Sequence, residues 1–374
     1  MGRSALETRR DRLPWGLVGM IGLVALIERG IDRDELSFST NAAMSWRHGG
    51  HAAGREATGS EILCLGDSQV QFQLQPRVIE HRTGRTAYNL GLWGASPPGS
   101  YYQLKHALAA GAKPTALVVD FQPKALELHP ASQTRLWPEL LTTLEAAEVS
   151  WTARDPSLFA RIALGLHLPS YRDRYEARLL VSAAFRGEDL RKGNLYWISP
   201  LWRNWKFNRG ATVMPRNPVP PTTISQATLA NHTKPWSRDR VAVTYMRRFL
   251  ALAASRRIPV YWVLAPDHPL IHAKREELGQ NEEFTRFARS LLREFPGVTV
   301  VDARRSRFPA EVFVDLIHLD RQGAHTFTSG VAEVLARGPD PNARWGELPA
   351  YRDIPAEVAI EDLNESRVAM KIVP

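Results

Sequence analysis

The chain has 374 residues, of which 44% are hydrophobic and 23% are charged, a composition typical of a globular protein with a sizeable core. Its formal net charge is +9, which favours loose association with anionic lipid or acidic polysaccharide. No basic run is long enough for a nucleic-acid arm and no zinc-finger or RNA-binding motif is present, so we expect no nucleic-acid partner. The single cysteine, Cys64, excludes an intrachain disulfide and a cysteine-based metal site.

Residues 1–35 have the pattern of a membrane anchor or signal anchor. Arginines precede an apolar run from Trp15 to Ile27. The run is shorter than the ~20 residues that usually cross a bilayer, and no small-residue cleavage site follows it. We therefore predict an uncleaved anchor, with the bulk of the chain outside the membrane, in the periplasm or at the cell surface. An amphiphilic first helix is the alternative.

Residues 36–60 are rich in Gly, Ala, Ser, His and Arg without a period, and we predict a linker there. A folded domain is expected over residues 61–340, followed by a C-terminal extension over 341–374. Short apolar runs predict its buried strands, and segments bounded by capping or breaking residues predict its helices. The expected strands cover 61–66, 86–90, 115–120, 258–264 and 298–301, and the expected helices cover 100–110, 239–256, 280–294 and 321–336.

Continuous apolar strands that alternate with helices predict a parallel sheet covered on both faces. We expect a three-layer α/β fold with a five-stranded, flavodoxin-like parallel sheet. The alternation is interrupted over residues 125–237, which are helical in texture and then rich in proline. This segment is predicted to be an insertion that caps the active-site edge, and not a second domain.

The first candidate catalytic residue is Ser68, in Gly66-Asp67-Ser68 directly after the first strand. Open parallel sheets bind ligands at the carboxyl ends of their strands. The glycine permits a sharp turn that exposes the serine hydroxyl. Serine is a weak nucleophile until a base removes its proton, so this site requires a partner.

That partner is predicted to be Asp315-Leu-Ile-His318, which follows the last strand and precedes the final helix. In a loop, a carboxylate three residues before a histidine can fix the imidazole tautomer, so that the other ring nitrogen faces the serine. Asp320 is explained as the N-cap of the final helix, but this explanation covers neither Asp315 nor His318.

Asn89 and Gly91 close the second strand, beside the carboxyl end of the first strand. The backbone N–H of Gly91, together with that of Ser68, is a candidate donor to an oxyanion, and losing one such donor typically costs about 100- to 1000-fold in rate. The alternative is an ordinary glycine between a strand and a loop.

These three motifs resemble, in order and in position, the blocks of the SGNH/GDSL hydrolase family. The resemblance covers about residues 61–121 and 258–336. It implies that Ser68 attacks an acyl carbonyl, that His318 is the base and that Asp315 orients it. It also implies an oxyanion role for the block that holds Asn89 and Gly91.

One block departs from the family. Members usually carry Gly-x-Asn-Asp after the third strand, with the Asn side chain as an oxyanion donor, whereas this chain reads Val119-Asp-Phe-Gln-Pro123. Gln122 is the candidate replacement donor. The departure resembles divergent, membrane-anchored members that handle O-acetyl groups on exopolysaccharides or D-alanyl esters on cell-wall polymers.

The sequence thus predicts a serine-dependent ester hydrolase or O-acyltransferase, acting on acetyl or other acyl esters, with an extracytoplasmic carbohydrate polymer as the expected substrate. A catalytically decayed binding or scaffold protein on the same fold is the alternative. Asp267-His268 follows the fourth strand and is interpreted as a loop pair at the pocket mouth. A metal site would need more ligands at consistent spacing, so neither a metal nor a cofactor is expected.

Overall fold

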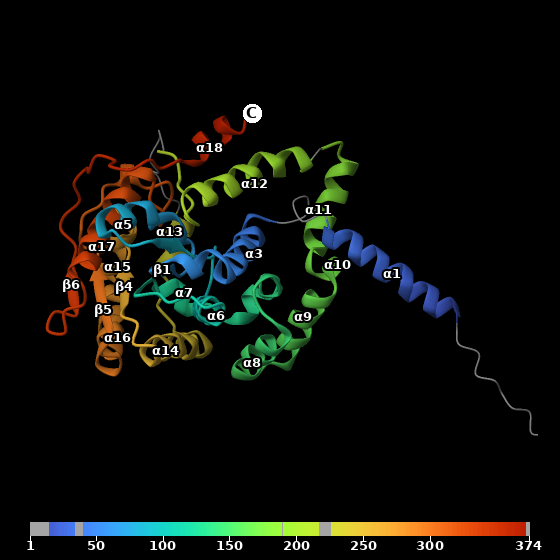
Figure 1. The fold of residues 1–374 in the computed structure, drawn as a ribbon, viewed down its shortest axis with the longest axis horizontal. Helices are drawn as coiled ribbons and strands as arrows, with labels where there is room; N and C mark the ends of the chain where they lie inside the picture. Colours follow the sequence, from blue (N-terminus) through green and yellow to red (C-terminus); the bar gives the residue numbers. More distant parts are fainter. Residues whose placement is uncertain (1–14, 34–39, 189, 217–225, 372–374) are drawn as a thin grey trace, which may run out of the picture.

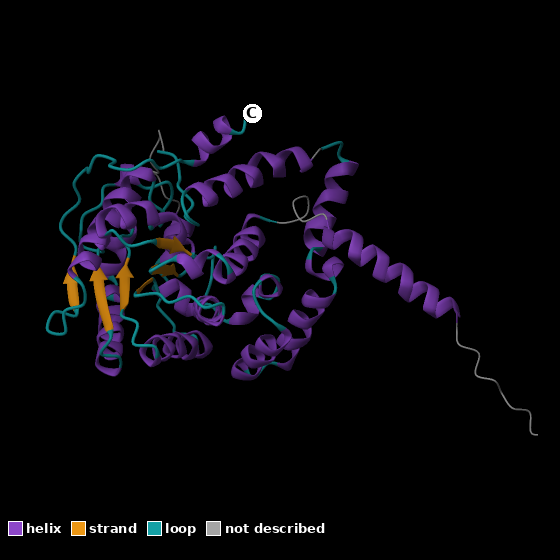
Figure 2. Ribbon diagram, viewed as in Figure 1, coloured by secondary structure: helices purple, strands orange, loops and turns teal. Residues whose placement is uncertain are grey.

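A computed structural model describes residues 15–33, 40–188, 190–216 and 226–371 of the chain. Its centre is a six-stranded sheet in the order β2-β1-β3-β4-β5-β6, with every neighbouring pair parallel (Figures 1 and 2). The strands are β1 Ile62–Leu65, β2 Ala87–Asn89, β3 Ala116–Val119, β4 Val260–Leu264, β5 Val298–Asp302 and β6 Trp345–Glu347. Every residue of β1 to β5 is buried, which explains their unbroken apolar pattern.

Helices cover both faces of the sheet, so the domain has the predicted three layers. Alternate residues of a strand enter opposite cores: Leu63 and Leu65 enter one, Ile62 and Cys64 the other. The first core is closed by α3 Asn41–Gly54, α6 Pro97–Ala109, α14 Arg240–Ser255 and α16 Gln280–Glu294. The second is closed by α4 Ser68–Gln73, α5 Pro76–Thr83 and α17 Arg321–Arg337.

The predicted linker is wrong over most of its length. Residues 41–54 form α3, which the hydroxyl of Thr40 caps, and residues 56–59 form a 3₁₀ turn, so both belong to the folded domain. Trp46 of α3 is fully buried and its indole N–H donates to the Trp93 carbonyl over 2.9 Å. The helix buries mostly small side chains, so its sequence carries little of the amphipathic signal that identifies a helix.

The sheet has one strand more than predicted. β6 lies in the expected C-terminal extension and pairs with β5, with Val300 opposite Trp345. This edge strand has three residues and is partly exposed, so it lacks an apolar run. Backbone hydrogen bonds hold it at both ends, from Val300 to the Arg344 carbonyl and from Leu348 to the Asp302 carbonyl.

The insertion folds onto the same body and adds a helical arm beside the layers (Figure 1). Its helices are α7 Pro123–Glu127, α8 Thr143–Ala153, α9 Pro156–His167, α10 Pro169–Arg172, α11 Arg174–Phe185, α12 Leu190–Phe207 and α13 Gln226–His232. Of these, α8 and α9 share a core with Trp46 of α3, Tyr102 of α6 and Tyr245 of α14. The C-terminal helix α18, Leu363–Ala369, packs through Leu363 on α12. The helix α15, Pro269–Glu277, follows β4.

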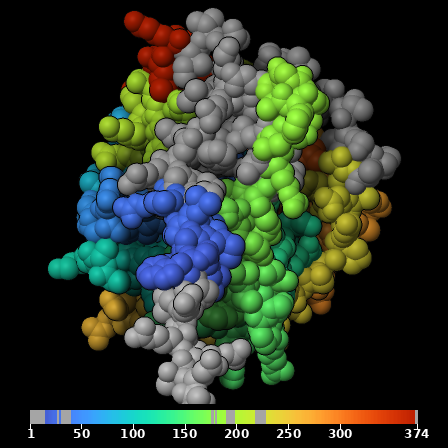
Figure 3. Space-filling model, turned by 90° about the vertical axis from the view of Figure 1, so that its right-hand side faces the viewer, coloured from blue at the N-terminus to red at the C-terminus, as the bar shows by residue number. Residues whose placement is uncertain are grey.

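The N-terminal helix α1, Trp15–Arg33, contacts α10 of the insertion and otherwise projects from the body (Figures 1 and 3). The Ser170 N–H donates to the Glu28 carboxylate over 2.7 Å and joins α1 to α10. Large apolar side chains along α1 are exposed: Trp15, Leu17, Val18, Met20, Ile21, Leu23, Val24 and Leu26. Over the ranges described, no helix combines the length and apolarity needed to cross a bilayer, and this includes α1, where the sequence predicted an anchor. Residues 1–14 of that prediction lie outside the described residues.

Candidate active site

Ser68 is the first residue of α4 and follows β1 after a two-residue turn. Gly66 is required in this turn because a Cβ there would lie 2.4 Å from a methyl carbon of Val70. Asp67 caps the helix, since its Oδ1 accepts from the Gln69 N–H over 2.8 Å. The turn therefore places the serine hydroxyl at the carboxyl edge of the sheet, as predicted.

The three predicted catalytic side chains meet at this edge. Nε2 of His318 lies 2.9 Å from Oγ of Ser68, and Nδ1 of His318 lies 2.7 Å from Oδ2 of Asp315. Both distances are within hydrogen-bond reach. The serine and histidine come from residues 250 apart in the chain and are joined only by the folding of the sheet. The arrangement can transfer a proton from Ser68 to His318.

Asp315 is fixed by the backbone of its own loop. Its Oδ1 accepts from the N–H groups of Ile317, over 2.9 Å, and His318, over 2.8 Å. Burial raises the pKa of Asp315, but the hydrogen bonds from His318 and from the two backbone groups outweigh it, so the pKa lies below its ordinary value. The carboxylate therefore stays ionised and holds the Nδ1 proton of the imidazole.

Two glutamines of α4 tie the serine helix to the histidine loop. The side-chain amides of Gln69 and Gln73 both donate to the Ile317 carbonyl, which lies next to His318. The sequence analysis missed both residues. Their spacing of four residues, which puts them on one helix face, was the available signal. The ring of Phe72 adds an apolar contact, with its centroid 4.7 Å from that of His318.

Asn89 and Gly91 lie beside α4, but the predicted oxyanion role is not supported by their contacts. The Gly91 N–H donates to Oδ1 of Asn89 over 2.8 Å, so this donor is already engaged. The Asn89 amide donates to the carbonyls of Val70 and Leu74, each over 2.8 Å. Asn89 thus holds the end of α4 through the Leu74 carbonyl and through the Val70 carbonyl, which also accepts from the Leu74 N–H. Both residues act on the position of α4.

Gln122 does not replace the missing asparagine as a free donor. Its side-chain amide donates to Oδ2 of Asp67, directly before the serine. Burial raises the pKa of Asp67, and the hydrogen bonds from Gln122 and Gln69 offset this only in part. The remaining donor of the predicted hole is the backbone N–H of Ser68, because the first N–H groups of a helix have no acceptor within it.

Asp120 is a buried carboxyl behind the serine turn that the sequence analysis did not single out. It ends β3 and is 2% exposed, and neither of its carboxyl oxygens has a hydrogen-bond partner among the described residues. Burial, followed by the nearby charges of Asp67 and Asp267, raises the pKa of Asp120 well above its ordinary value. An Asp at the end of a wholly apolar strand was the signal in the sequence.

Asp267 and His268 have structural partners, as their interpretation as a loop pair requires. Asp267 forms a buried ion pair with Arg275 of α15, with 2.5 Å between Oδ2 and Nη1. The His268 backbone N–H donates to the Leu316 carbonyl over 3.2 Å and so joins the β4 loop to the catalytic loop. Across the described parts of the chain, no group of three or more His, Cys, Asp or Glu side chains is arranged to hold a metal ion.

Comparisons of the chain with models of known protein families and with curated proteins found no match. The fold and the site by themselves define an α/β protein with a Ser–His–Asp arrangement at the carboxyl ends of its parallel strands.

Proposed function

We propose that this protein is a serine-dependent ester hydrolase or O-acyltransferase of the SGNH/GDSL type. The observation that carries the proposal is the chain of two hydrogen bonds from Ser68 through His318 to Asp315, 2.9 and 2.7 Å long. The order of the three sequence blocks along the chain supports it. Nucleophile, base and orienting carboxylate are what acyl transfer through a serine requires.

In the proposed reaction Oγ of Ser68 attacks the ester carbonyl carbon while Nε2 of His318 takes the hydroxyl proton. The tetrahedral intermediate collapses, the C–O bond to the leaving alcohol breaks, and His318 returns the proton to that alcohol. A water molecule or a sugar hydroxyl then attacks the acyl-serine with His318 as base. Water gives net hydrolysis and a sugar hydroxyl gives acyl transfer. Asp315 stabilises the imidazolium in both steps.

A catalytically decayed binding or scaffold protein is the second candidate. Three predicted oxyanion donors, Gly91, Asn89 and Gln122, already donate to other groups of the protein, and this favours the second candidate. The Ser68 N–H is then left as the oxyanion donor. Each oxyanion donor that a site lacks is expected to slow it by about 100- to 1000-fold. Slow turnover with intact serine reactivity therefore distinguishes a weak enzyme from a decayed one.

The test is covalent labelling with a fluorophosphonate, together with hydrolysis of a small acetyl ester. The wild-type protein is expected to be labelled, and Ser68→Ala is expected to lose both labelling and hydrolysis. Asp315→Asn should label about 10³-fold more slowly, because the imidazole tautomer is no longer fixed. Ser255→Ala, an exposed serine at the end of α14, is the matched control. An unlabelled wild-type protein would contradict the enzymatic proposal and support the decayed scaffold.

We also propose an extracytoplasmic location, with the N-terminal segment holding the protein at a membrane and a carbohydrate polymer as substrate. The exposed apolar side chains of α1 and the arginines that precede them in the sequence support the membrane contact. The net charge of +9 supports an anionic surface or polymer as the partner.

A further inference from the structure

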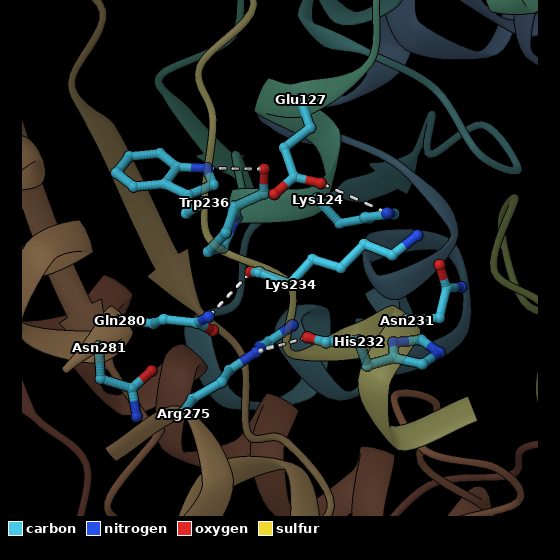
Figure 4. A pocket seen from close by; sticks show the side chains of 10 residues that line it. Lys124, Glu127, Asn231, His232, Lys234, Trp236, Arg275, Gln280 and Asn281 are labelled. Atoms are coloured by element: carbon cyan, nitrogen blue, oxygen red, sulfur yellow. Dashed lines mark hydrogen bonds and ion pairs between the residues drawn. The ribbon is translucent and has the colours of Figure 1, made fainter. Parts of the chain in front are cut away.

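A basic pocket lies beyond the carboxyl ends of β3 and β4 (Figure 4). Loops and helices that follow β3 and β4 meet α13 there. The lining residues are Pro123, Lys124, Glu127, Asn231, His232, Lys234, Trp236, Arg275, Gln280 and Asn281. We refer to this site as the Lys124–Lys234 pocket.

Two connections place the pocket beside the catalytic residues. Pro123 and Lys124 directly follow Gln122, which holds the carboxylate of Asp67 next to Ser68. On the other side, Pro123, Arg275 and Asn281 also line a second hollow, which reaches Gln69 of α4, the helix that begins with Ser68.

The pocket is built by hydrogen bonds that fix its walls. Arg275 donates to the His232 carbonyl over 3.4 Å, and the Gln280 amide donates to the Lys234 carbonyl over 2.8 Å (Figure 4). The indole N–H of Trp236 donates to the Pro123 carbonyl over 3.1 Å, and this ring is 9% exposed. These contacts fix the backbone that carries Lys124 and Lys234, whether or not a ligand is bound.

The charges in the pocket do not cancel. Lys124 pairs with Glu127, with 3.3 Å between Nζ and Oε2, and Arg275 pairs with Asp267. Lys234 is exposed and has no ion-pair partner among the residues that the structure describes. Figure 4 shows the ammonium ends of Lys124 and Lys234 extending to the same side of the pocket as the Asn231 amide. Two ammonium groups and an amide are donors that suit a carboxylate or a phosphate.

We propose that the Lys124–Lys234 pocket binds an anionic group, a carboxylate or a phosphate, on the acylated substrate and thereby positions its ester at Ser68. This inference rests on the proposed function and adds a substrate class: an acylated polymer with negatively charged units. The cationic donors lie outside the catalytic hydrogen bonds, so they select the substrate and take no part in the acyl transfer.

The test compares acetyl esters that differ only in charge. The substrates are an acetylated neutral trisaccharide, the same trisaccharide with a uronate carboxylate, and one with a phosphomonoester. The wild-type enzyme is expected to prefer an anionic ester, and Lys234→Gln is expected to lower the ratio of kcat/KM between anionic and neutral esters about tenfold. The two anionic substrates distinguish a carboxylate from a phosphate as the preferred group.

Lys113→Gln is the matched control, because it removes the same charge from an exposed loop before β3, at the opposite edge of the sheet. Its anionic-to-neutral ratio should equal that of the wild type. A wild-type ratio of one, or an equal loss in both variants, would overturn the inference while leaving the esterase intact.

Binding separates this outcome from a failure of the proposed function. If the wild type cleaves no ester at all, the enzymatic proposal fails. Titration of Ser68→Ala with the unacetylated uronate trisaccharide still tests the pocket: weaker binding in the Ser68→Ala, Lys234→Gln double variant supports it, and unchanged binding contradicts it.

Discussion

At the scale of single residues, the site depends on two aspartates, Asp315 and Asp67, whose carboxylate oxygens all have hydrogen-bond partners. Asp315 uses one oxygen for its own loop and the other for His318, so the imidazole has one orientation available. Asp67 divides its oxygens between the Gln69 N–H and the Gln122 amide in the same way. Asp120 is the exception, because both of its oxygens lack a partner in the described structure.

The unpartnered carboxyl predicts a pH-dependent gain in stability for Asp120→Asn. The folded-state pKa of Asp120 is raised above the unfolded value of 3.8, so the protonated carboxyl stabilises the fold below about pH 4, and this contribution is lost as the pH rises through the folded-state pKa. The neutral amide does not titrate. Asp120→Asn is therefore expected to be more stable than the wild type by about 1–3 kcal/mol at pH 8, and the difference should shrink toward pH 4.

Urea denaturation at several pH values measures this difference. Asp340→Asn, at an exposed position far along the chain, serves as the control and should show no such trend. A variant that is less stable than the wild type by the same amount at every pH would contradict a raised pKa of Asp120 in the folded protein.

At the scale of elements, the position of α4 decides whether the serine meets the histidine. This helix has six residues, too few to be stable alone, so its neighbours must hold it. Gln69 and Gln73 join it to the catalytic loop, and Asn89 at the end of β2 holds its last turn. The predicted oxyanion residues thus contribute to the site through the helix that carries Ser68.

We expect Asn89→Ala to affect both stability and catalysis. It removes one of two hydrogen bonds to the Val70 carbonyl and leaves the Leu74 carbonyl and the Gly91 N–H without their partner in a buried region, which should cost about 2–4 kcal/mol. Because α4 is released at one end, the rate of fluorophosphonate labelling of Ser68 should also fall, by about tenfold or more.

Thermal denaturation and labelling kinetics measure the two effects. Asn364→Ala, at an exposed position in α18, is the control and should change neither. If Asn89→Ala labels as fast as the wild type at a temperature where both are folded, Asn89 has no role in positioning the serine.

At the scale of the whole molecule, the proposed active site and α1 belong to different regions. The site lies at the carboxyl edge of the sheet, whereas α1 lies against the helical arm of the insertion through the contact between Glu28 and Ser170 (Figure 1). A membrane bound by α1 would therefore lie near the arm, and the edge of the sheet that carries the proposed active site would stay accessible to a substrate.

Membrane binding through α1 predicts flotation of the full-length protein with vesicles of neutral and anionic phospholipid. The Met20→Asp, Leu23→Asp double variant should lose at least about tenfold in vesicle affinity, because two exposed apolar contacts become charges. The Leu278→Asp, Val368→Asp variant makes the same change at exposed positions elsewhere and should float like the wild type. Equal flotation of both variants would exclude α1 as the attachment.

The sequence by itself determined the central strands, the helices α6, α14, α16 and α17, and the three candidate catalytic residues. β1, β3, β4 and β5 are buried on both faces, so their apolar runs are continuous and local. The Asp315–His318 hydrogen bond spans three residues in one loop, so its spacing is also a local property. Because the strands are parallel, their carboxyl ends lie at one edge of the sheet. Ser68, which follows β1, and the loop that holds Asp315 and His318 therefore meet at this edge.

Only the tertiary structure decided the remaining features. The helix α3 buries small residues and forms because α6 and the insertion cover it, and β6 needs the backbone of β5 as its partner. The direction of a hydrogen bond from Asn89, Gly91 or Gln122 depends on which acceptor another segment brings close. Such contacts join residues that are distant in the chain or compete for one atom, and a local pattern of residue types does not encode that choice.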